Sequence, residues 1–145
     1  MTEEILYDYL SSSEEETMML GMEFAESISK GDLILLYGEL GAGKTCFIKG
    51  ILRGLRINEI ANSPSFIVVR QFEDKMKINH IDLYRLSSRQ MLLDYGIDEY
   101  IDDIEAVTLV EWAENLLLDC SPSFNVFIKK LDNNNREIII IKKTD

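Results

Sequence analysis

The sequence is poor in cysteine and histidine, and this removes several kinds of site from consideration. Cys46 and Cys120, its only cysteines, lack the spacing of a metal-binding pair and are too few for a disulfide framework. We therefore expect two free thiols. His80 is the only histidine, so the sequence gives no basis for arguing a Ser-His-Asp triad. A lone histidine on a strand is more often a core residue than a ligand, although a role beside a functional site stays open for His80.

Long apolar runs are also missing. No stretch approaches the roughly 20 residues that a membrane-spanning helix requires. The first residues, Met-Thr-Glu-Glu-Ile-Leu, contain neither a basic region nor an apolar secretory core. We therefore expect a cytoplasmic protein without a membrane interaction. With 145 residues, of which 46% are hydrophobic, the chain is large enough for one core, and we expect a single domain over residues 1–145.

Basic residues are outnumbered by acidic ones, 15 against 26, which gives a net charge of −11. An acidic surface repels a phosphate backbone, so direct tight binding to nucleic acid is not expected. One small basic group, Lys49, Arg53 and Arg56, falls on one side of a predicted helix. It is either a solvated helix face or a docking patch for an acidic partner.

A complete phosphate-binding motif stands out against this background. Residues 38–45 read Gly-Glu-Leu-Gly-Ala-Gly-Lys-Thr, which matches the pattern G-x-x-x-x-G-K-[ST]. The glycines allow close backbone approaches, and the loop amides and the positive end of the following helix converge on phosphate oxygens. In such a loop Lys44 reaches the β- and γ-phosphates, and the Thr45 hydroxyl is a ligand of the bridging Mg²⁺.

The surrounding pattern has the order that this motif requires. Residues 33–37 form an apolar run typical of a strand buried on both faces. After Lys44, apolar residues recur at helical spacing up to about residue 55, at Ile48, Ile51, Leu52 and Leu55. Strand, glycine loop and amphipathic helix therefore follow one another, which favours a phosphate site over an ordinary glycine-rich turn.

The rest of the chain predicts an α/β fold, a single P-loop NTPase domain with a mixed central sheet flanked by helices. Two predicted hairpins, residues 66–72 with 77–84 and residues 124–130 with 136–143, introduce antiparallel pairs. Further strands are expected at residues 5–10 and 106–111. Helices are expected after the Ser-Glu capping sequence at 11–16, with Met18, Met22, Ala25 and Ile28 facing the core and an end at Gly31; over 87–101 with a break near Gly96; and from Trp112 to Leu118.

Two carboxylates, Asp82 and Glu111, each end an apolar strand. In a doubly wound sheet the carboxyl ends of the strands line the ligand crevice. Chemistry on a magnesium nucleotide needs an acidic partner for the metal. Either carboxylate could hold the metal or its water, while the other orients the attacking water. A simple helix-capping role is the alternative for both.

Three more residues are candidates on position alone. Ser65 lies between the phosphate-binding helix and the next strand, where a switch hydroxyl can reach the γ-phosphate or Mg²⁺; a Ser-Pro turn is the alternative. Trp112 is either a packing residue or a shield for the site. Cys46 either packs in the helix or is a redox-sensitive position beside the phosphate loop.

Taken in order, these segments resemble the TsaE family, formerly YjeE, which comprises small bacterial ATPases of tRNA threonylcarbamoyladenosine biosynthesis. The similarity covers about residues 11–130. The segments that carry it are residues 38–45, 63–66, 80–86, Gly96-Ile97 with Glu99-Tyr100, and 109–112. Many families share the phosphate loop, whereas His-x-Asp-x-Tyr-Arg at residues 80–85 and Val-Glu-Trp at residues 110–112 make the match specific.

The resemblance implies a P-loop fold and hydrolysis of ATP with Mg²⁺. Because no residue is clearly an arginine finger, we expect hydrolysis to be slow for the chain alone and to be stimulated by partners. It implies work with TsaB and TsaD, of which TsaD transfers the threonylcarbamoyl group to adenosine 37 of tRNA, so that tRNA is met only through the complex. By position, Lys44, Asp82 and Glu111 are the catalytic candidates, with Asp82 orienting water; Thr45 and Glu111 are the metal candidates. The residues that the resemblance implies as nucleotide contacts are Glu39, Gly41, Ala42, Gly43, Lys44, Thr45, Cys46, Ser65 and Trp112.

Two departures from the family pattern matter. Ser65 stands where threonine is usual, which keeps the hydroxyl and loses the stiffening methyl group. Cys46 stands where a second hydroxyl is common, which weakens the case for a polar nucleotide contact there. No residue is clearly an internal arginine finger, although Arg85 is a possible substitute. A small-molecule kinase and a non-hydrolysing nucleotide-dependent docking module remain as alternatives.

Overall fold

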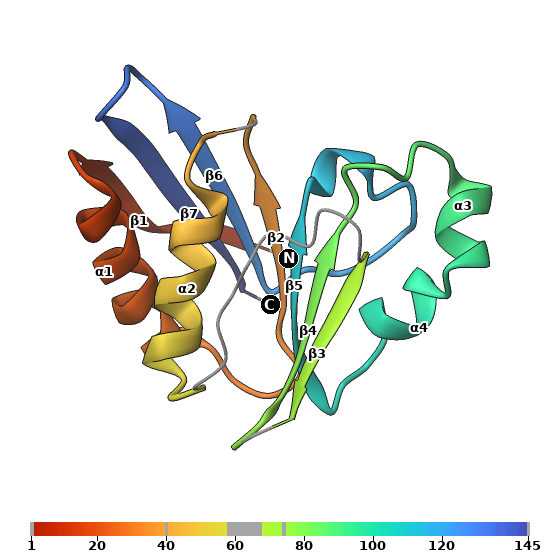
Figure 1. The fold of residues 1–145 in the computed structure, drawn as a ribbon. Helices are drawn as coiled ribbons and strands as arrows, with labels where there is room; N and C mark the ends of the chain where they lie inside the picture. The colour runs from red at the N-terminus through yellow and green to blue at the C-terminus, as the bar shows by residue number, and fades with distance from the viewer. Residues whose placement is uncertain (1, 40, 58–67, 74, 145) are drawn as a thin grey trace.

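A mixed β-sheet runs through the whole molecule (Figure 1). The computed structural model describes residues 2–39, 41–57, 68–73 and 75–144. Within these ranges seven strands form one sheet in the order β1-β7-β6-β2-β5-β4-β3. The strands are β1 (Thr2–Ser11), β2 (Leu33–Tyr37), β3 (Val69–Glu73), β4 (Lys77–Asp82), β5 (Ala106–Glu111), β6 (Phe124–Lys130) and β7 (Arg136–Thr144).

The centre of the sheet is parallel and its borders are antiparallel. Strands β4, β5, β2 and β6 run in the same direction, whereas β3 pairs antiparallel with β4, and β7 pairs antiparallel with both β6 and β1. This confirms the predicted mixed sheet and both predicted antiparallel pairs, although β4 ends at Asp82 and not at residue 84. Residues 66 and 67 of the first predicted hairpin lie outside the described residues. Because β2, β4 and β5 are parallel, their carboxyl ends meet at one edge, where a ligand site is expected.

Helices cover both faces of the sheet. The helices are α1 (Glu14–Phe24), α2 (Lys44–Gly54), α3 (Arg89–Asp94) and α4 (Ile97–Ile101), with 3₁₀ turns η1 (Ala25–Ser27) and η2 (Ala113–Asn115). The pair α1 and α2 lies on one side and the pair α3 and α4 on the other (Figure 1). None of the helices in the described ranges is long and apolar enough to cross a membrane.

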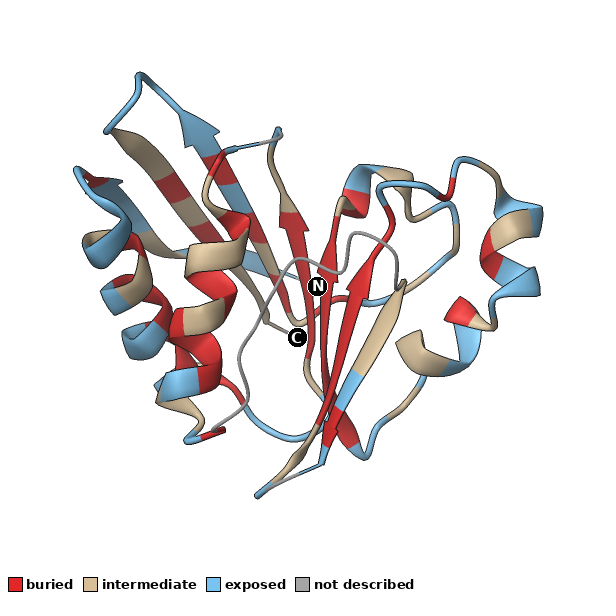
Figure 2. Cartoon of the chain, viewed as in Figure 1, coloured by how far each residue is buried: buried red, intermediate tan, exposed pale blue. Residues whose placement is uncertain are grey.

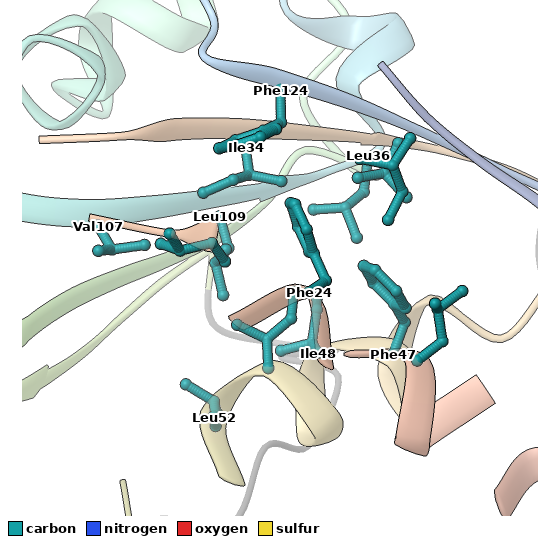
Figure 3. Packing of buried hydrophobic residues seen from close by; sticks show 14 of the residues in the cluster. Phe24, Ile34, Leu36, Phe47, Ile48, Leu52, Val107, Leu109 and Phe124 are labelled. Atoms are coloured by element: carbon teal, nitrogen blue, oxygen red, sulfur yellow. The ribbon is translucent and has the colours of Figure 1, made fainter. Parts of the chain in front are cut away.

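The parallel strands are buried on both faces because alternate side chains enter two different cores (Figure 2). Ile34 and Leu36 of β2 pack in the core under α1 and α2, whereas Leu33 and Leu35 pack in the core under α3 and α4. Phenylalanine rings pack against one another in the first core, where the ring of Phe24 lies 5.8 Å from that of Phe47 and 4.9 Å from that of Phe124 (Figure 3). The apolar runs seen in the sequence thus reflect two-sided burial.

The predicted inward face of the first helix is wrong for its two methionines. Met22 is 41% exposed and Met18 is only half-buried, whereas Ala25 and Ile28 are buried as predicted. The buried residues of α1 are Thr17, Leu20, Gly21 and Phe24. The reason is a close contact between the two helices, since a Cβ atom on Gly50 of α2 would lie 2.0 Å from the carbonyl oxygen of Met18. The helices meet backbone to backbone, so methionine side chains do not fill the space between them.

The predicted capping sequence starts α1 as expected. The backbone amide of Glu16 donates to the Ser13 hydroxyl at 3.0 Å. The Glu16 carboxylate reaches back and accepts from the Ser12 amide and hydroxyl, both at 2.7 Å. These two hydrogen bonds lower the pKa of Glu16. The reciprocal arrangement fixes the start of α1 beside the phosphate loop.

The segment after β5 departs from the prediction of a helix from Trp112 to Leu118. Only the short 3₁₀ turn η2 forms there, because Trp112 adopts a left-handed backbone conformation with φ of 56°. The chain therefore changes direction immediately after Glu111. The predicted break of the helix over residues 87–101 is confirmed, since Gly96 separates α3 from α4 with φ of 70°.

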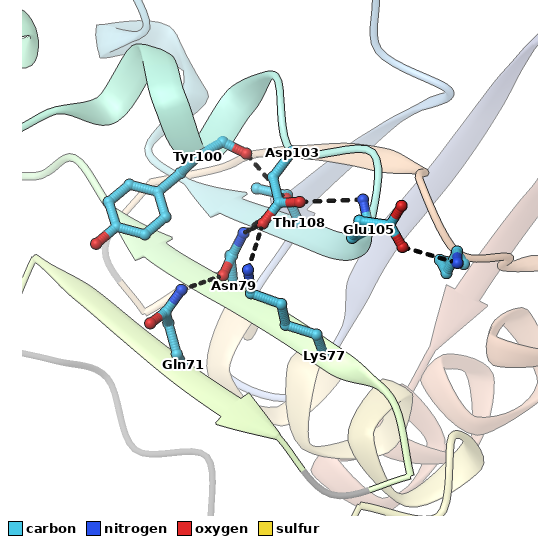
Figure 4. A network of polar contacts seen from close by, with 8 residues as sticks. Gln71, Lys77, Asn79, Tyr100, Asp103, Glu105 and Thr108 are labelled. Carbon is cyan, nitrogen blue, oxygen red and sulfur yellow. Dashed lines mark hydrogen bonds and ion pairs between the residues drawn. The ribbon is translucent and has the colours of Figure 1, made fainter.

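A polar network connects β3 and β4 to the segment that follows α4, near the amino-terminal ends of the parallel strands (Figure 4). Buried Asn79 donates to Asp103 at 3.3 Å and accepts from Gln71 at 2.9 Å. Lys77 pairs with Asp103 at 2.8 Å and, more than any other group, lowers the pKa of that carboxyl. This network lies at the edge opposite the carboxyl ends of the strands, so it stabilises the fold without reaching the site.

Candidate nucleotide-binding site

A cavity of about 470 Å³ opens beside the phosphate loop, at the carboxyl ends of the central strands. The residues that line it come from four places in the chain: the start of α1, the phosphate loop with α2, the end of β5, and the turn between β6 and β7. They are Ser12, Ser13, Glu14, Thr17, Gly41, Ala42, Gly43, Lys44, Thr45, Cys46, Glu111, Trp112, Asn133, Asn134 and Arg136. The volume lies within the range of small-molecule sites.

The phosphate loop needs its glycines for their backbone conformations. Gly41 and Gly43 have φ of 80° and 105°, which side chains disfavour. Gly38 needs the space, because a Cβ atom there would lie 2.7 Å from the carbonyl oxygen of Ile128. Gly43 precedes α2 without any side-chain cap. The first amides of α2 therefore stay available for an anion at the positive end of the helix.

Lys44 is the cationic group of this loop. Its side chain is buried, its Nζ donates to the carbonyl oxygen of Gly38, and its Nζ lies 3.7 Å from the ring centroid of Trp112. Burial lowers the pKa of Lys44, and nearby carboxylates, Glu111 foremost, oppose that shift. The ammonium group is thus held between a carbonyl oxygen and an aromatic face, close to where phosphate oxygens would bind.

The two predicted carboxylates end neighbouring strands in register. Asp82 of β4 stands opposite Glu111 of β5. His80 lies two residues before Asp82 and therefore on the same face of β4. Its Nε2 is 2.7 Å from Oε2 of Glu111, and the two side chains are 1% and 3% exposed. The His-x-Asp spacing thus places a buried imidazole and a carboxylate on the side of the sheet that faces the phosphate loop.

Asp82 does not line the cavity, but it stands in register with Glu111, which does. Its Oδ1 accepts from the backbone amide of Tyr84 at 2.9 Å, and it is 9% exposed. Burial raises the pKa of Asp82, and the charge of Glu111 adds to the rise, while the Tyr84 amide, His80 and Lys44 act against it. A buried carboxyl with a raised pKa beside a cation is a candidate for proton transfer or water orientation.

The cavity brings together eight of the residues expected to contact nucleotide or metal, namely Gly41, Ala42, Gly43, Lys44, Thr45, Cys46, Glu111 and Trp112. Glu39 and Asp82 are described but do not line it. Ser65 lies outside the described residues, so the switch prediction stays a prediction. Burial raises the pKa of the Cys46 thiol, which does not favour the reactive thiolate considered for that position.

Trp112 joins the cavity to the surface. Its ring lies under Lys44 on one side, and the ring of Tyr84 lies 4.9 Å away at an angle of 48°. Tyr84 is 54% exposed. The left-handed backbone of Trp112 is what turns its side chain out of the strand direction, directly after Glu111. An aromatic pair therefore connects the lysine of the phosphate loop to solvent.

Arg136 is a site residue that the sequence did not reveal. Its guanidinium holds the phosphate loop from outside, with Nε 3.0 Å from the carbonyl oxygen of Ala42 and Nη2 3.3 Å from that of Gly41. Its Nη1 donates to the carbonyl oxygens of Asp132 and Asn135 at 2.8 and 3.1 Å. One side chain thus joins the loop to the β6–β7 turn while lining the cavity.

The β6–β7 turn is itself strongly ordered by hydrogen bonds. The Asp132 carboxylate accepts from the amides of Asn134 and Asn135 at 2.9 and 2.8 Å and from the Asn135 side chain at 2.8 Å. These bonds, the Asn135 side chain first, lower the pKa of Asp132. The sequence predicted this turn but did not show that it lies beside the phosphate loop. Knowing the strand order would have revealed this contact, because β6 lies next to β2 and so brings the turn to the loop.

The donor set of the cavity fits magnesium bound together with a nucleotide. In the described part of the chain, no group of three or more His, Cys, Asp and Glu side chains is arranged to hold a metal ion. The Thr45 hydroxyl and the Glu111 carboxylate both line the cavity and are hard oxygen donors. Mg²⁺ is commonly bound through one or two such groups, with phosphate oxygens and water completing its coordination.

A phosphate loop between the central strand β2 and helix α2, with carboxylates at the ends of adjacent parallel strands, defines a phosphate-binding-loop α/β protein. The family model described as "Threonylcarbamoyl adenosine biosynthesis protein TsaE" matches residues 11–138. The chain belongs to this TsaE family.

Individual relatives agree with the family match. The TsaE protein of Bacillus subtilis (strain 168) is 38% identical over 127 residues, which cover 86% of this chain and 78% of the relative. That of Aquifex aeolicus (strain VF5) is 36% identical over 143 residues, covering 97% and 99%. The crystal structure of YdiB from Bacillus subtilis has a TM-score of 0.79 at 30% identity, covering 98% of this chain and 88% of that one. The similar fold supports the expected architecture.

Proposed function

We propose that this protein binds and hydrolyses Mg·ATP as the ATPase subunit of tRNA threonylcarbamoyladenosine biosynthesis. In this role it supports turnover of a TsaD–TsaB transferase and does not itself transfer the threonylcarbamoyl group. The observation that carries the proposal is the cavity in which Lys44, Thr45 and Glu111 meet around the amino-terminal end of α2. Membership of the TsaE family supports the role in threonylcarbamoyladenosine biosynthesis, and the residues that line the cavity support ATP binding and hydrolysis.

Each residue of the cavity has a defined task in this proposal. The loop amides and Lys44 bind the β- and γ-phosphates and neutralise their charge. Thr45 and Glu111 hold the metal ion directly or through water, and the ion supplies further charge neutralisation on the phosphates. Asp82, opposite Glu111 in register, orients the attacking water and accepts its proton. Burial of Lys44, Glu111 and Asp82 strengthens their electrostatic effect at the reacting atoms.

The geometry also favours a slow basal rate. Arg136 is the arginine that lines the cavity, and its guanidinium is engaged with loop and turn carbonyls. An arginine that acts on the transferring phosphoryl group is worth roughly 10³–10⁵ in rate. Arg85 remains the candidate for an internal substitute. Stimulation by partners is therefore part of the proposal, while the net charge of −11 is consistent with tRNA being met only through the complex.

The test is release of phosphate from ATP by the chain alone and with purified TsaB and TsaD. Lys44→Ala is the control, because it removes the phosphate-neutralising charge and leaves the loop glycines in place. We expect a low rate alone, marked stimulation by the pair, and neither in the variant. Absence of stimulation would contradict the partner-dependent role, and equal rates in the variant would contradict the site. Transfer of phosphate to a nucleoside instead would favour a kinase.

A further inference from the structure

The side chains of His80 and Glu111 interact in an almost completely buried position at the candidate site. The imidazole is 1% exposed and the carboxylate 3%. Burying a carboxylate is costly unless it is hydrogen-bonded, and among the described residues His80 is the partner within hydrogen-bonding distance of Glu111. A pair that served only stability could be replaced by apolar side chains at little cost. The pair therefore needs an explanation at the site.

The tautomer of His80 follows from its surroundings. Its Nδ1 is buried and has no hydrogen-bond partner within the described ranges of the chain. A proton on Nδ1 would be a buried donor without an acceptor, which costs about 1–3 kcal/mol. The proton therefore belongs on Nε2, which donates to Oε2 of Glu111 at 2.7 Å. His80 is in this way a fixed donor to a single carboxylate oxygen.

This hydrogen bond orients the carboxylate at the cavity. Glu111 lines the cavity, and its Oε2 is occupied by His80 while Oε1 has no such bond to the described residues. Groups that hold the outer side of a metal-binding carboxylate set its orientation, and their loss typically costs about 10–100-fold in metal affinity or activity. His80 comes from β4, two residues before Asp82, so the same strand also fixes the second carboxylate of the site.

We propose that His80 is a positioning residue that holds Oε2 of Glu111, so that the other carboxylate oxygen is directed to the divalent cation, or to a water bound to it, in the nucleotide cavity. The inference rests on the proposed Mg·ATP function. His80 touches neither nucleotide nor reacting atoms, and it acts only through Glu111. The proposal thus assigns a role at the site to the single histidine of the chain.

The wild-type protein itself allows a direct test, because a single histidine gives one imidazole spin system in ¹⁵N–¹H spectra of untagged protein. We expect the Nε2–H tautomer. We also expect the Nε2 resonance to shift when Mg²⁺ is added to the ADP-bound protein, more than when ADP is added with a chelator. The opposite tautomer, or resonances that do not move with Mg²⁺, would overturn the proposal without requiring any variant to fold.

Variants supply the functional readout. His80→Leu removes the donor, whereas His80→Gln can place an amide donor near the position of Nε2. We expect His80→Leu to raise the Mg²⁺ concentration for half-maximal ATPase activity about tenfold or more. ADP affinity in chelator should stay unchanged, and His80→Gln should recover most of the loss. Ile78→Ala is the matched control, since Ile78 is fully buried on the same face of β4 and should lose stability without changing the Mg²⁺ requirement.

The outcomes distinguish a failure of the proposed function from a failure of the positioning role of His80. If the wild-type protein binds no nucleotide, or binds it without any response to Mg²⁺, the proposed function itself fails. If the wild type responds to Mg²⁺ and His80→Leu has the same Mg²⁺ requirement, only the positioning role fails, and His80 is a packing residue. If His80→Leu and Ile78→Ala change the Mg²⁺ requirement equally, the effect is one of general stability and the positioning role also fails.

Discussion

The guanidinium Nε of Arg136 lies 3.0 Å from the carbonyl oxygen of Ala42, so the first residue of β7 holds a loop 94 residues earlier in the chain. With Nη2 on the carbonyl of Gly41, the contact keeps loop carbonyls directed outward. The loop amides are then left for an anion inside the cavity. The shape of the phosphate site thus depends on the last hairpin as well as on the motif.

The first prediction concerns this contact. Arg136→Gln should lower nucleotide affinity about tenfold or more, because hydrogen bonds to a charged group contribute about 1.5–3 kcal/mol. Calorimetric titration with ADP and ATP measures the effect. Lys129→Gln on the same hairpin is the control, since Lys129 is exposed and its loss should leave affinity unchanged. Equal affinity in Arg136→Gln and wild type would show that the loop keeps its shape without the arginine.

The second prediction concerns the buried carboxyl of Asp82, whose pKa is raised chiefly by burial. Because the folded-state pKa lies above the unfolded one, the folded state binds more protons between them, and stability falls as pH rises through that window. The cost is absent well below the pKa of the unfolded state and grows as the pH rises toward and through the pKa of the folded state. Asp82→Asn should therefore melt at a higher temperature than wild type at pH 7, with the difference shrinking toward pH 4, while hydrolysis is lost.

Melting curves in the presence of a chelator and without nucleotide provide the test for Asp82. Asp8→Asn, on the exposed outer strand, controls for the general effect of removing one negative charge. A melting difference that is the same at pH 7 and pH 4 would contradict the burial argument. Normal phosphate release by Asp82→Asn would remove Asp82 from the water-orienting role.

The third prediction concerns the contact between α1 and α2. A methyl group on Gly50 would lie 2.0 Å from the carbonyl oxygen of Met18, and backbone atoms cannot move aside as a flexible side chain can. Gly50→Ala should lower the free energy of unfolding by about 1–3 kcal/mol, although alanine is the better helix former. Urea denaturation measures the loss. Lys49→Ala on the same helix should stay within about 0.5 kcal/mol of wild type, and a similar result for Gly50→Ala would refute the close contact.

The fourth prediction uses Trp112, the single tryptophan of the chain, whose ring lies 3.7 Å from Nζ of Lys44. When bound phosphate attracts the ammonium group of Lys44 away from the ring, the electrostatic environment of the indole changes. Intrinsic fluorescence should therefore change on addition of ATP, and the change should be absent in Lys44→Ala. Trp112→Phe should lose the signal while keeping a weaker cation–ring contact. A signal that persists in Lys44→Ala would mean that the indole reports on something other than this lysine.

Much of the fold and half of the site follow from local pattern, because a phosphate loop, a hairpin turn and a two-sided strand each depend on neighbouring residues. The backbone conformations of the loop glycines and the shared strand face of His80 and Asp82 are features that such local pattern determines. Arg136 does not, because its place depends on the order of strands in the sheet. The inward face of α1 was wrong because methionine spacing could not reveal a glycine contact, and the helix after Glu111 was wrong because nothing local marks the left-handed backbone of Trp112.

Because β7 lies between β1 and β6, this side of the sheet cannot be completed until β7 has been synthesised. Among the described strands, β1 pairs with β7 alone, so the first strand has no neighbour until the last one has been synthesised. Ser11 and Arg136 are partners in that pairing, and both lead directly into walls of the cavity. A nascent chain on the ribosome therefore displays the phosphate-binding motif long before it can enclose a nucleotide, and the pocket closes only after β7 has been synthesised.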